Sequence, residues 1–147
     1  MNIITVKFSN SENYRKDIGK SLYLESLKFN STAKTILEIG PGKGEAALEF
    51  FNNDPSHHQQ IIFVEPNLEH ANLLSARFPK SLILAQSIEK IVLESKGLPN
   101  DLDIVVANFS LHWVEGITKT AKALFEHLND GGILAVANTD FIRSFWG

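Results

Sequence analysis

A buried strand followed by three closely spaced glycines and a helix is the feature that most restricts how this chain can fold. Residues 35–50, TILEIGPGKGEAALEF, predict a strand over 35–39, a tight loop and a helix that opens at Glu45. Glycine lets the backbone turn sharply and approach a ligand closely, because it has no Cβ. We therefore expect a ligand to lie across the backbone between this strand and this helix.

The spacing of the glycines narrows the choice of ligand. They stand at Gly40, Gly42 and Gly44, whereas the dinucleotide pattern G-x-G-x-x-G would need a glycine in place of Glu45. Glu38 lies two residues before the first glycine, where a carboxylate disfavours a pyrophosphate and suits a cationic or hydroxyl-rich ligand. A phosphate-bearing nucleotide, or a glycine turn without any ligand, remain the alternatives at this point.

Composition sets outer limits on the protein class. The chain has 147 residues, a formal net charge of −3 and no cysteine. This length predicts a single domain over 1–147, and the charge gives no sign of a general nucleic-acid or membrane surface. Without cysteine, disulfides, zinc–thiolate sites and thiol nucleophiles are excluded, which is compatible with the cytoplasm, our expected location. The histidines at 57, 58, 70 and 127 show no metal-ligand spacing, so no metal site is expected.

The remaining pattern predicts an α/β fold. Residues 1–10 carry no informative pattern. Apolar runs predict further strands over 61–64, 81–85, 102–107 and 133–137, and helical periodicity predicts helices over 11–29, 68–78, from 87 onward and 117–128. Nearly continuous apolar strands that alternate with helices are typical of a parallel sheet covered on both faces, with a core over about 35–140. Ligands of such sheets bind at the carboxyl ends of the strands.

Two of these motifs resemble those of a known family. The pattern E-x-G-x-G-x-G resembles the first motif of class I S-adenosylmethionine (SAM)-dependent methyltransferases, and NFSLHWV at 108–114 resembles a later motif of the trans-aconitate and malonyl-carrier methyltransferases. The resemblance covers about residues 10–140. It implies a Rossmann-like doubly wound sheet with strand order 3-2-1-4-5, SAM as cofactor and S-adenosylhomocysteine as product. It also implies a cofactor site that includes Glu38, Gly40, Pro41, Gly42 and Gly44.

The resemblance assigns further contacts to the ends of the other strands. Glu65 would accept both ribose hydroxyls, because a carboxylate can accept two hydrogen bonds at once, and Pro66 would offer an apolar face to adenine. The adenine edge would meet the backbone N–H of Ile88 and a side chain from Gln86 or Ser87. Many relatives carry aspartate in place of Ser87.

The fourth strand would supply the methyl-transfer end of the site. Asn108 would face the methionyl part of SAM, and His112 is a candidate catalytic base or orienting group. An alternative role for His112 is to pack or cap the following helix. The amino-methylating motif Asn-Pro-Pro-aromatic is absent, since Phe109 and Ser110 replace both prolines. We therefore expect a small-molecule acceptor with an oxygen nucleophile, a carboxylate or a hydroxyl. A SAM-binding module that is idle or needs a partner is the alternative, and a dinucleotide-binding protein is a weaker one.

The end of the chain raises a question about the sheet. The family's sheet continues past the fifth strand into a helix and two antiparallel strands, whereas the residues that follow 137 leave room for only part of a helix. The fifth strand is then expected to be an open apolar edge, and such edges tend to pair with other chains. This predicts either a chain that is truncated at its C-terminus, or a homo-oligomer or partner subunit that covers the edge.

Overall fold

Strands and helices alternate along the described part of the chain. The computed structural model describes residues 2–6, 14–94, 97–108, 110–111 and 114–137. Its elements, in chain order, are β1 (Asn2–Val6), α1 (Tyr14–Phe29), β2 (Thr35–Ile39), α2 (Glu45–Asn53), β3 (Gln60–Val64), α3 (Leu68–Arg77), β4 (Leu82–Leu84), α4 (Ile88–Glu94), β5 (Leu102–Asn108), α5 (Ile117–His127) and β6 (Leu128–Ala137).

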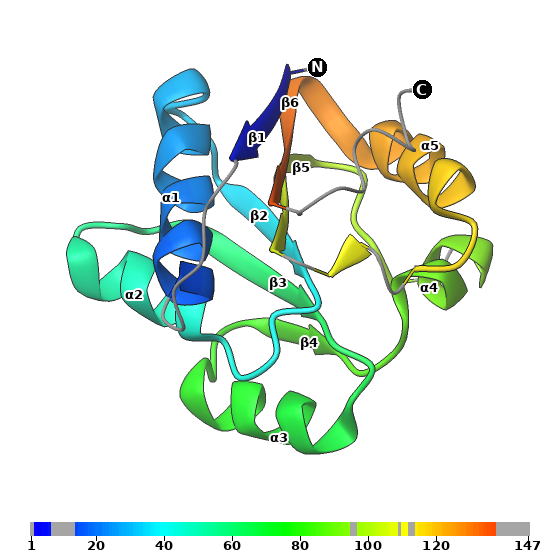
Figure 1. The fold of residues 1–147 in the computed structure, drawn as a ribbon, viewed down its shortest axis with the longest axis horizontal. Coiled ribbons are helices and arrows are strands. Elements are labelled where there is room, and N and C mark those ends of the chain that lie inside the picture. The colour runs from blue at the N-terminus through cyan, green and yellow to red at the C-terminus, as the bar shows by residue number, and fades with distance from the viewer. Residues whose placement is uncertain (1, 7–13, 95–96, 109, 112–113, 138–147) are drawn as a thin grey trace.

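The described strands form one parallel sheet in the order β1-β6-β5-β2-β3-β4 (Figure 1). The five strands that the sequence predicted appear in the predicted order, so the Rossmann-like doubly wound fold is confirmed. The sequence analysis predicted only five strands, however, and β1 adds a sixth.

β1 occupies the edge that the sequence analysis left open. Its residues pair in parallel with β6, from Asn2 opposite Ile133 to Val6 opposite Ala137. The predicted open apolar edge at β6 is therefore wrong, because the amino-terminal strand supplies its hydrogen-bonding partner. A homo-oligomer or partner subunit stays a prediction. Five residues without a clear alternation gave no local signal for a strand that pairs with the other end of the chain.

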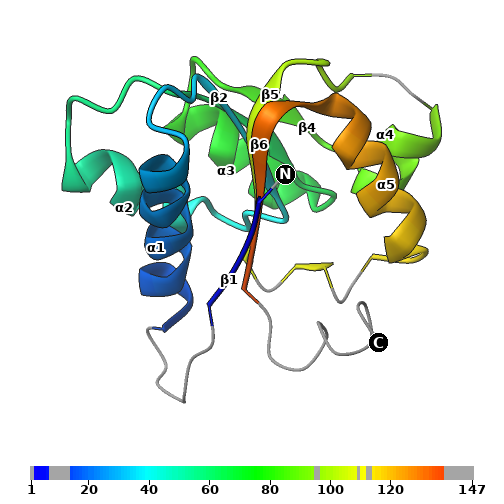
Figure 2. The same ribbon diagram turned by 90° about the horizontal axis from the view of Figure 1, so that it is seen from above.

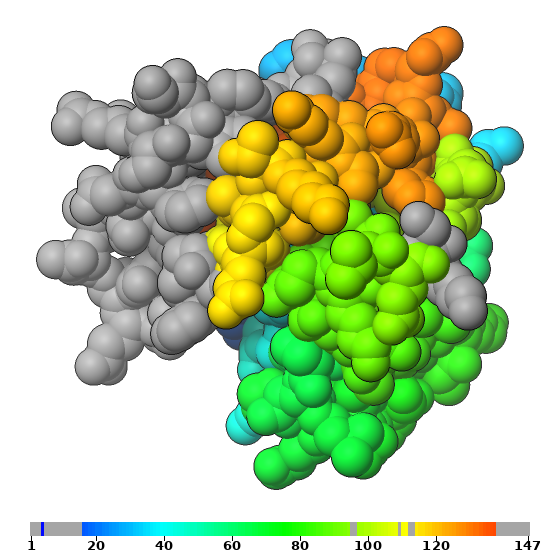
Figure 3. Space-filling model, turned by 90° about the vertical axis from the view of Figure 1, so that its right-hand side faces the viewer, coloured from blue at the N-terminus to red at the C-terminus, as the bar shows by residue number. Residues whose placement is uncertain are grey.

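Two layers of helices cover the sheet. Helices α1, α2 and α3 pack on one face, and α4 and α5 lie side by side on the other (Figures 2 and 3). Side chains alternate along each strand, so Ile36 belongs to the first core and Leu37 to the second. By the same alternation Glu38 points toward α1 and α2. No described helix is long and apolar enough to span a bilayer.

One carboxylate ties three segments together at the amino ends of the central strands. Oδ2 of Asp103 accepts hydrogen bonds from the backbone N–H groups of Lys34 (2.7 Å) and Thr35 (3.1 Å). Oδ1 accepts from the Asn129 side chain at 2.8 Å. Asn129 lies within β6, beside a register shift against β5. Asp103 thus joins β2, β5 and β6 at the end of the sheet opposite the glycine loop.

Asp103→Ala should lower the free energy of unfolding by about 1–3 kcal/mol at neutral pH, because two backbone donors lose a charged acceptor. Burial works to raise the pKa of this carboxyl, but the hydrogen bonds from Asn129, Lys34 and Thr35 outweigh it and hold the pKa below its ordinary value of 3.8. The stabilisation is therefore present above that value and is lost as the pH falls through the folded-state pKa. Denaturant titrations at several pH values measure this. The exposed Asp101→Ala is the matched control, and equal losses in the two variants would contradict the assignment.

Candidate functional site

Each glycine of the loop after β2 has a positive φ, but the surroundings of Gly42 differ from those of Gly40 and Gly44. The φ angles are 63° at Gly40, 59° at Gly42 and 82° at Gly44, a region that disfavours side chains. A Cβ on Gly40 would lie 2.6 Å from Ser110 Cβ, and one on Gly44 would lie 2.7 Å from Leu74. A Cβ on Gly42 would meet nothing within 4 Å. Gly40 and Gly44 thus permit close packing, whereas Gly42 leaves open space above the loop.

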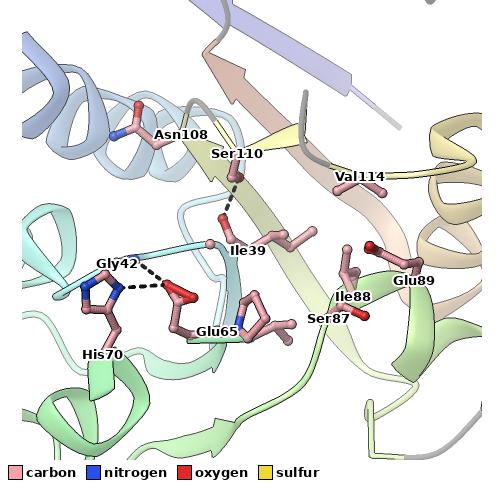
Figure 4. A pocket seen from close by; sticks show the side chains of 13 residues that line it. Ile39, Gly42, Glu65, His70, Ser87, Ile88, Glu89, Asn108, Ser110 and Val114 are labelled. Carbon is pink, nitrogen blue, oxygen red and sulfur yellow. Dashed lines mark hydrogen bonds and ion pairs between the residues drawn. The ribbon is translucent and has the colours of Figure 1, made fainter. Parts of the chain in front are cut away.

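This open space belongs to a cavity of about 380 Å³ at the carboxyl ends of the strands, within the usual range for small-molecule sites (Figure 4). Seven of the predicted site residues line it: Gly40, Gly42, Glu65, Pro66, Ser87, Ile88 and Asn108. The sequence analysis missed the other lining residues, which are Ile39, Val64, His70, Glu89, Ser110 and Val114.

Four predicted site residues do not line the cavity. Glu38 is buried below it with 1 % exposure, and Gly44 packs α2 against α3. The Pro41 carbonyl accepts a hydrogen bond from Gly44 N within the loop, and Gln86 points to solvent. His112 lies outside the described residues. A direct role of any of these five in ligand binding stays a prediction.

Glu65 joins the ends of two neighbouring strands. Its side chain has 8 % exposure, and Oε1 accepts a hydrogen bond from the backbone N–H of Gly42 at 3.1 Å. Oε2 accepts from Asn67 N at 3.3 Å, and Nδ1 of His70 lies 3.6 Å from Oε1 (Figure 4). A carboxylate offers about four acceptor positions. Glu65 is therefore held against the glycine loop while it retains the capacity to accept hydrogen bonds from a ligand.

Glu38 anchors the first helix instead of facing the cavity. The Tyr23 hydroxyl of α1 donates a 2.6 Å hydrogen bond to Oε1 of Glu38, and Tyr23 is also fully buried. Burial raises the pKa of Glu38 from 4.5 to about 7; the Tyr23 hydrogen bond opposes this shift, and the charges of Glu45 and Glu65 add to it. Burial, and secondarily the charge of Glu38, raise the pKa of Tyr23 well above its usual value. This pair attaches α1 to the sheet directly below the glycine loop.

A glycine in α1 lets this helix pass close to the end of β5. A Cβ on Gly19 would clash with Ala46 of α2 and would lie 2.8 Å from Nδ2 of Asn108. The segment that follows β5 is held by Ser110, two residues after Asn108. Its Oγ donates a 2.6 Å hydrogen bond to the Ile39 carbonyl. Together these contacts bring α1, β2 and β5 to one wall of the cavity.

Charge and ligand type restrict what the cavity can hold. Its described lining includes the acids Glu65 and Glu89 and contains neither lysine nor arginine. Within the described residues, no group of three or more His, Asp or Glu side chains could hold a metal ion. The N–H groups of Gly40, Gly42 and Gly44 already donate to Val64, Glu65 and Pro41 within the protein, so the two carboxylates set the polar character of the cavity. These acceptors suit a ligand that carries hydroxyl groups and positive charge, and they disfavour phosphates.

Comparison with known proteins identifies the family. A family model described as "Methyltransferase domain" matches residues 12–141. The chain therefore belongs to the methyltransferase-domain family. A curated relative, the malonyl-[acyl-carrier protein] O-methyltransferase of Bacillus anthracis, is 24 % identical over 136 residues, which are 90 % of this chain and 48 % of that protein. The chain thus spans about half the length of the curated relative that it matches.

Solved structures share the fold. The plantazolicin methyltransferase BpumL in complex with S-adenosylhomocysteine matches with a TM-score of 0.68 at 17 % identity, over 90 % of this chain and 51 % of that one. The SAM-bound amino pentose methyltransferase CalS10 of Micromonospora echinaspora matches with a TM-score of 0.62 at 18 % identity, over 83 % and 50 %. At these identities the likeness supports the fold.

Glu38→Gln should change how stability depends on pH. The folded state raises the pKa of Glu38 to about 7, so it binds this proton more tightly than the unfolded state does. The resulting stabilisation of the wild type is full below the ordinary pKa of 4.5 and is lost as the pH rises through 7. A glutamine has no such proton. As the pH rises from about 4.5 to about 8, the wild type should therefore lose on the order of 3 kcal/mol of unfolding free energy relative to Glu38→Gln.

Thermal or denaturant unfolding at a series of pH values measures this shift. The exposed Glu126→Gln on α5 serves as the control and should follow the wild type at every pH. Tyr23→Phe removes the hydrogen bond that lowers the pKa of Glu38, so its loss of stability should extend to higher pH than in the wild type. A Glu38→Gln curve parallel to that of the wild type would show that the carboxyl titrates normally.

Proposed function

We propose that the cavity binds SAM and that the protein transfers its methyl group to a small-molecule acceptor in the cytoplasm, releasing S-adenosylhomocysteine. The observation that carries this proposal is the bond between Gly42 N and Glu65, which places an open glycine loop and a buried carboxylate at one wall of the cavity. The family match and the cofactor-bound structures of similar fold support it.

The residues present fit this cofactor. Glu65 would accept the two ribose hydroxyls, and Pro66 and Ile88 would lie against the faces of adenine. Gly40 and Gly42 would let the backbone approach the methionyl part, with Asn108 beside its polar end. When bound, SAM supplies an electrophilic methyl group on a positively charged sulfonium. The protein's part is to hold the acceptor in line with that methyl group in a space from which water is excluded.

An oxygen acceptor, a carboxylate or a hydroxyl, is the acceptor we propose. Support comes from the segment after β5, where Phe109 and Ser110 replace the prolines of the amino-methylating motif. The Ser110 hydroxyl already donates its hydrogen to the Ile39 carbonyl, so it cannot donate that hydrogen to the methyl acceptor. The name of the Bacillus anthracis relative, an O-methyltransferase, also supports oxygen. A carboxylate acceptor needs no general base, and His112 would then orient it.

Two alternatives can be tested directly. A SAM-binding module that is idle, or that needs further protein, would bind SAM and release no S-adenosylhomocysteine with any carboxylate or hydroxyl acceptor. A dinucleotide-binding protein would bind NAD in preference to SAM, which the acidic lining of the cavity disfavours. Calorimetry with SAM and with NAD separates the second alternative, and a turnover assay over an acceptor panel separates the first.

Glu65→Gln should weaken SAM binding by about one to two decades, because a charged acceptor of two hydroxyl hydrogen bonds is replaced by a neutral one. Isothermal calorimetry measures the dissociation constant. Glu69→Gln, an exposed acid in the first turn of α3, is the matched control and should bind like the wild type. Unchanged affinity in Glu65→Gln would remove Glu65 from the site.

Gly42→Ala tests where the ligand lies. Alanine at a φ of 59° is strained by about 1–2 kcal/mol, and its methyl group would extend into the open space above the loop. Gly131→Ala, at a φ of 76° with nothing within 4 Å, carries comparable strain in β6 away from the cavity. Both variants should lose similar stability, and only Gly42→Ala should lose SAM affinity, by tenfold or more; the larger Gly42→Val should lose more. If Gly42→Ala and Gly42→Val both retained their SAM affinity, the ligand would bind elsewhere.

A further inference from the structure

One face of α1 contacts two neighbouring strands near the ends that border the cavity. Tyr23 donates its 2.6 Å hydrogen bond to Glu38 of β2, and Gly19 lies four residues earlier, on the same face of the helix. An α-helix rises about 6 Å over four residues, so Gly19 lies one turn from Tyr23. There it faces Asn108 at the end of β5, the strand that pairs with β2. Both strands are therefore packed against a single helix.

Asn108 lies between this helix and the cavity. Side chains alternate along β5, and Ile104 and Val106 belong to the core on the side of α1. Asn108 continues this row of side chains, and it also lines the cavity (Figure 4). Helix α1 itself contributes no residue to the described lining of the cavity. An effect of α1 on a bound ligand is therefore indirect, and Asn108 is the lining residue that Gly19 faces.

Gly19 has no space for a side chain, and its two neighbours would respond differently to one. A Cβ at this position would clash with the Cβ of Ala46 and would lie 2.8 Å from Nδ2 of Asn108. The Cβ of Ala46 is fixed to the backbone of α2, so this clash would push two helices apart. Nδ2 is the far end of a flexible side chain, so the Asn108 amide would rotate instead. The absence of a Cβ on Gly19 thus serves both helix packing and the direction of the Asn108 amide.

We propose that Gly19 is a positioning residue of the cofactor site, because its missing side chain leaves the space that the Asn108 amide needs at the wall of the cavity. The inference rests on the proposed function, in which Asn108 lies beside the polar end of the methionyl part. An asparagine amide has a donor nitrogen and an acceptor oxygen. A methyl group at position 19 would turn this amide, which would then present different groups to the ligand.

Moving one methyl group from α2 to α1 isolates the contact with Asn108. In the double variant Gly19→Ala with Ala46→Gly, here called the exchange variant, the clash between the helices disappears. The nearest remaining atom of residue 46 is its Cα, at 3.4 Å, whereas Nδ2 of Asn108 still lies 2.8 Å from the new methyl group. Both positions are helical, so the gain in helix propensity at one offsets the loss at the other. The exchange variant should therefore fold and turn only the Asn108 amide.

Calorimetry on the full chain measures SAM binding, and thermal unfolding checks that each variant is folded. We expect the exchange variant to bind SAM about tenfold more weakly than the wild type, because the ligand loses one hydrogen bond. The control Ala46→Gly should bind like the wild type. Asn108→Ala should lose about as much affinity as the exchange variant. Combining the exchange with Asn108→Ala should cause no further loss, because both changes act through the same amide.

Three results would overturn the role of Gly19. The first is an exchange variant that binds SAM with the affinity of the wild type. The second is losses of affinity that multiply when the exchange is combined with Asn108→Ala, since a merely structural role would add to the loss of the amide. The third is an exchange variant that does not fold, because the backbone and not the amide would then yield. Each leaves the proposed function standing, provided that the wild type binds SAM; a wild type that does not bind SAM overturns both.

Discussion

The hydrogen bond from Gly42 N to Glu65 is the contact on which the arrangement of the site depends. It joins the loop that follows β2 to the end of β3, and the two strands are neighbours in the sheet. If the glycine loop were not fixed, the distance between the Glu65 carboxylate and the backbone of the loop would not be defined. A ligand that contacts both would then have no fixed site. The bond also gives the Gly42 N–H an acceptor and the buried Glu65 carboxylate a donor. It therefore serves both the fold and the proposed cofactor site.

Around this contact, the other polar groups each attach one more segment to the cavity wall. Tyr23 attaches α1 through Glu38, and Ser110 attaches the segment after β5 through the Ile39 carbonyl. Both bonds are buried, where hydrogen bonds are stronger and an unmatched partner is more costly. The site is thus formed by segments far apart in the chain, which hydrogen bonds attach to one another at the carboxyl end of the sheet.

Much of the site was predictable because it is encoded locally. The glycine spacing and Glu65 at the end of an apolar strand are patterns within a few residues, and parallel topology then brings strand ends together. Where the sequence analysis fell short, the missing information was non-local. His70 faces Glu65 from a helix whose periodicity says nothing about the neighbouring strand end. Gly19 looks like an ordinary helical glycine until Ala46 and Asn108 are placed against it.

The sequence by itself determined the order of strands and helices, the parallel sheet and the strand ends at which a ligand would bind, since these follow from short-range periodicity and glycine spacing. Only the tertiary structure decided that β1 closes the edge of β6, that Glu38 holds Tyr23 below the cavity, and that Glu89 enters it. The physical reason is that pairing and burial depend on which distant segments pack together. No local pattern in the chain predicts which of these segments pack together.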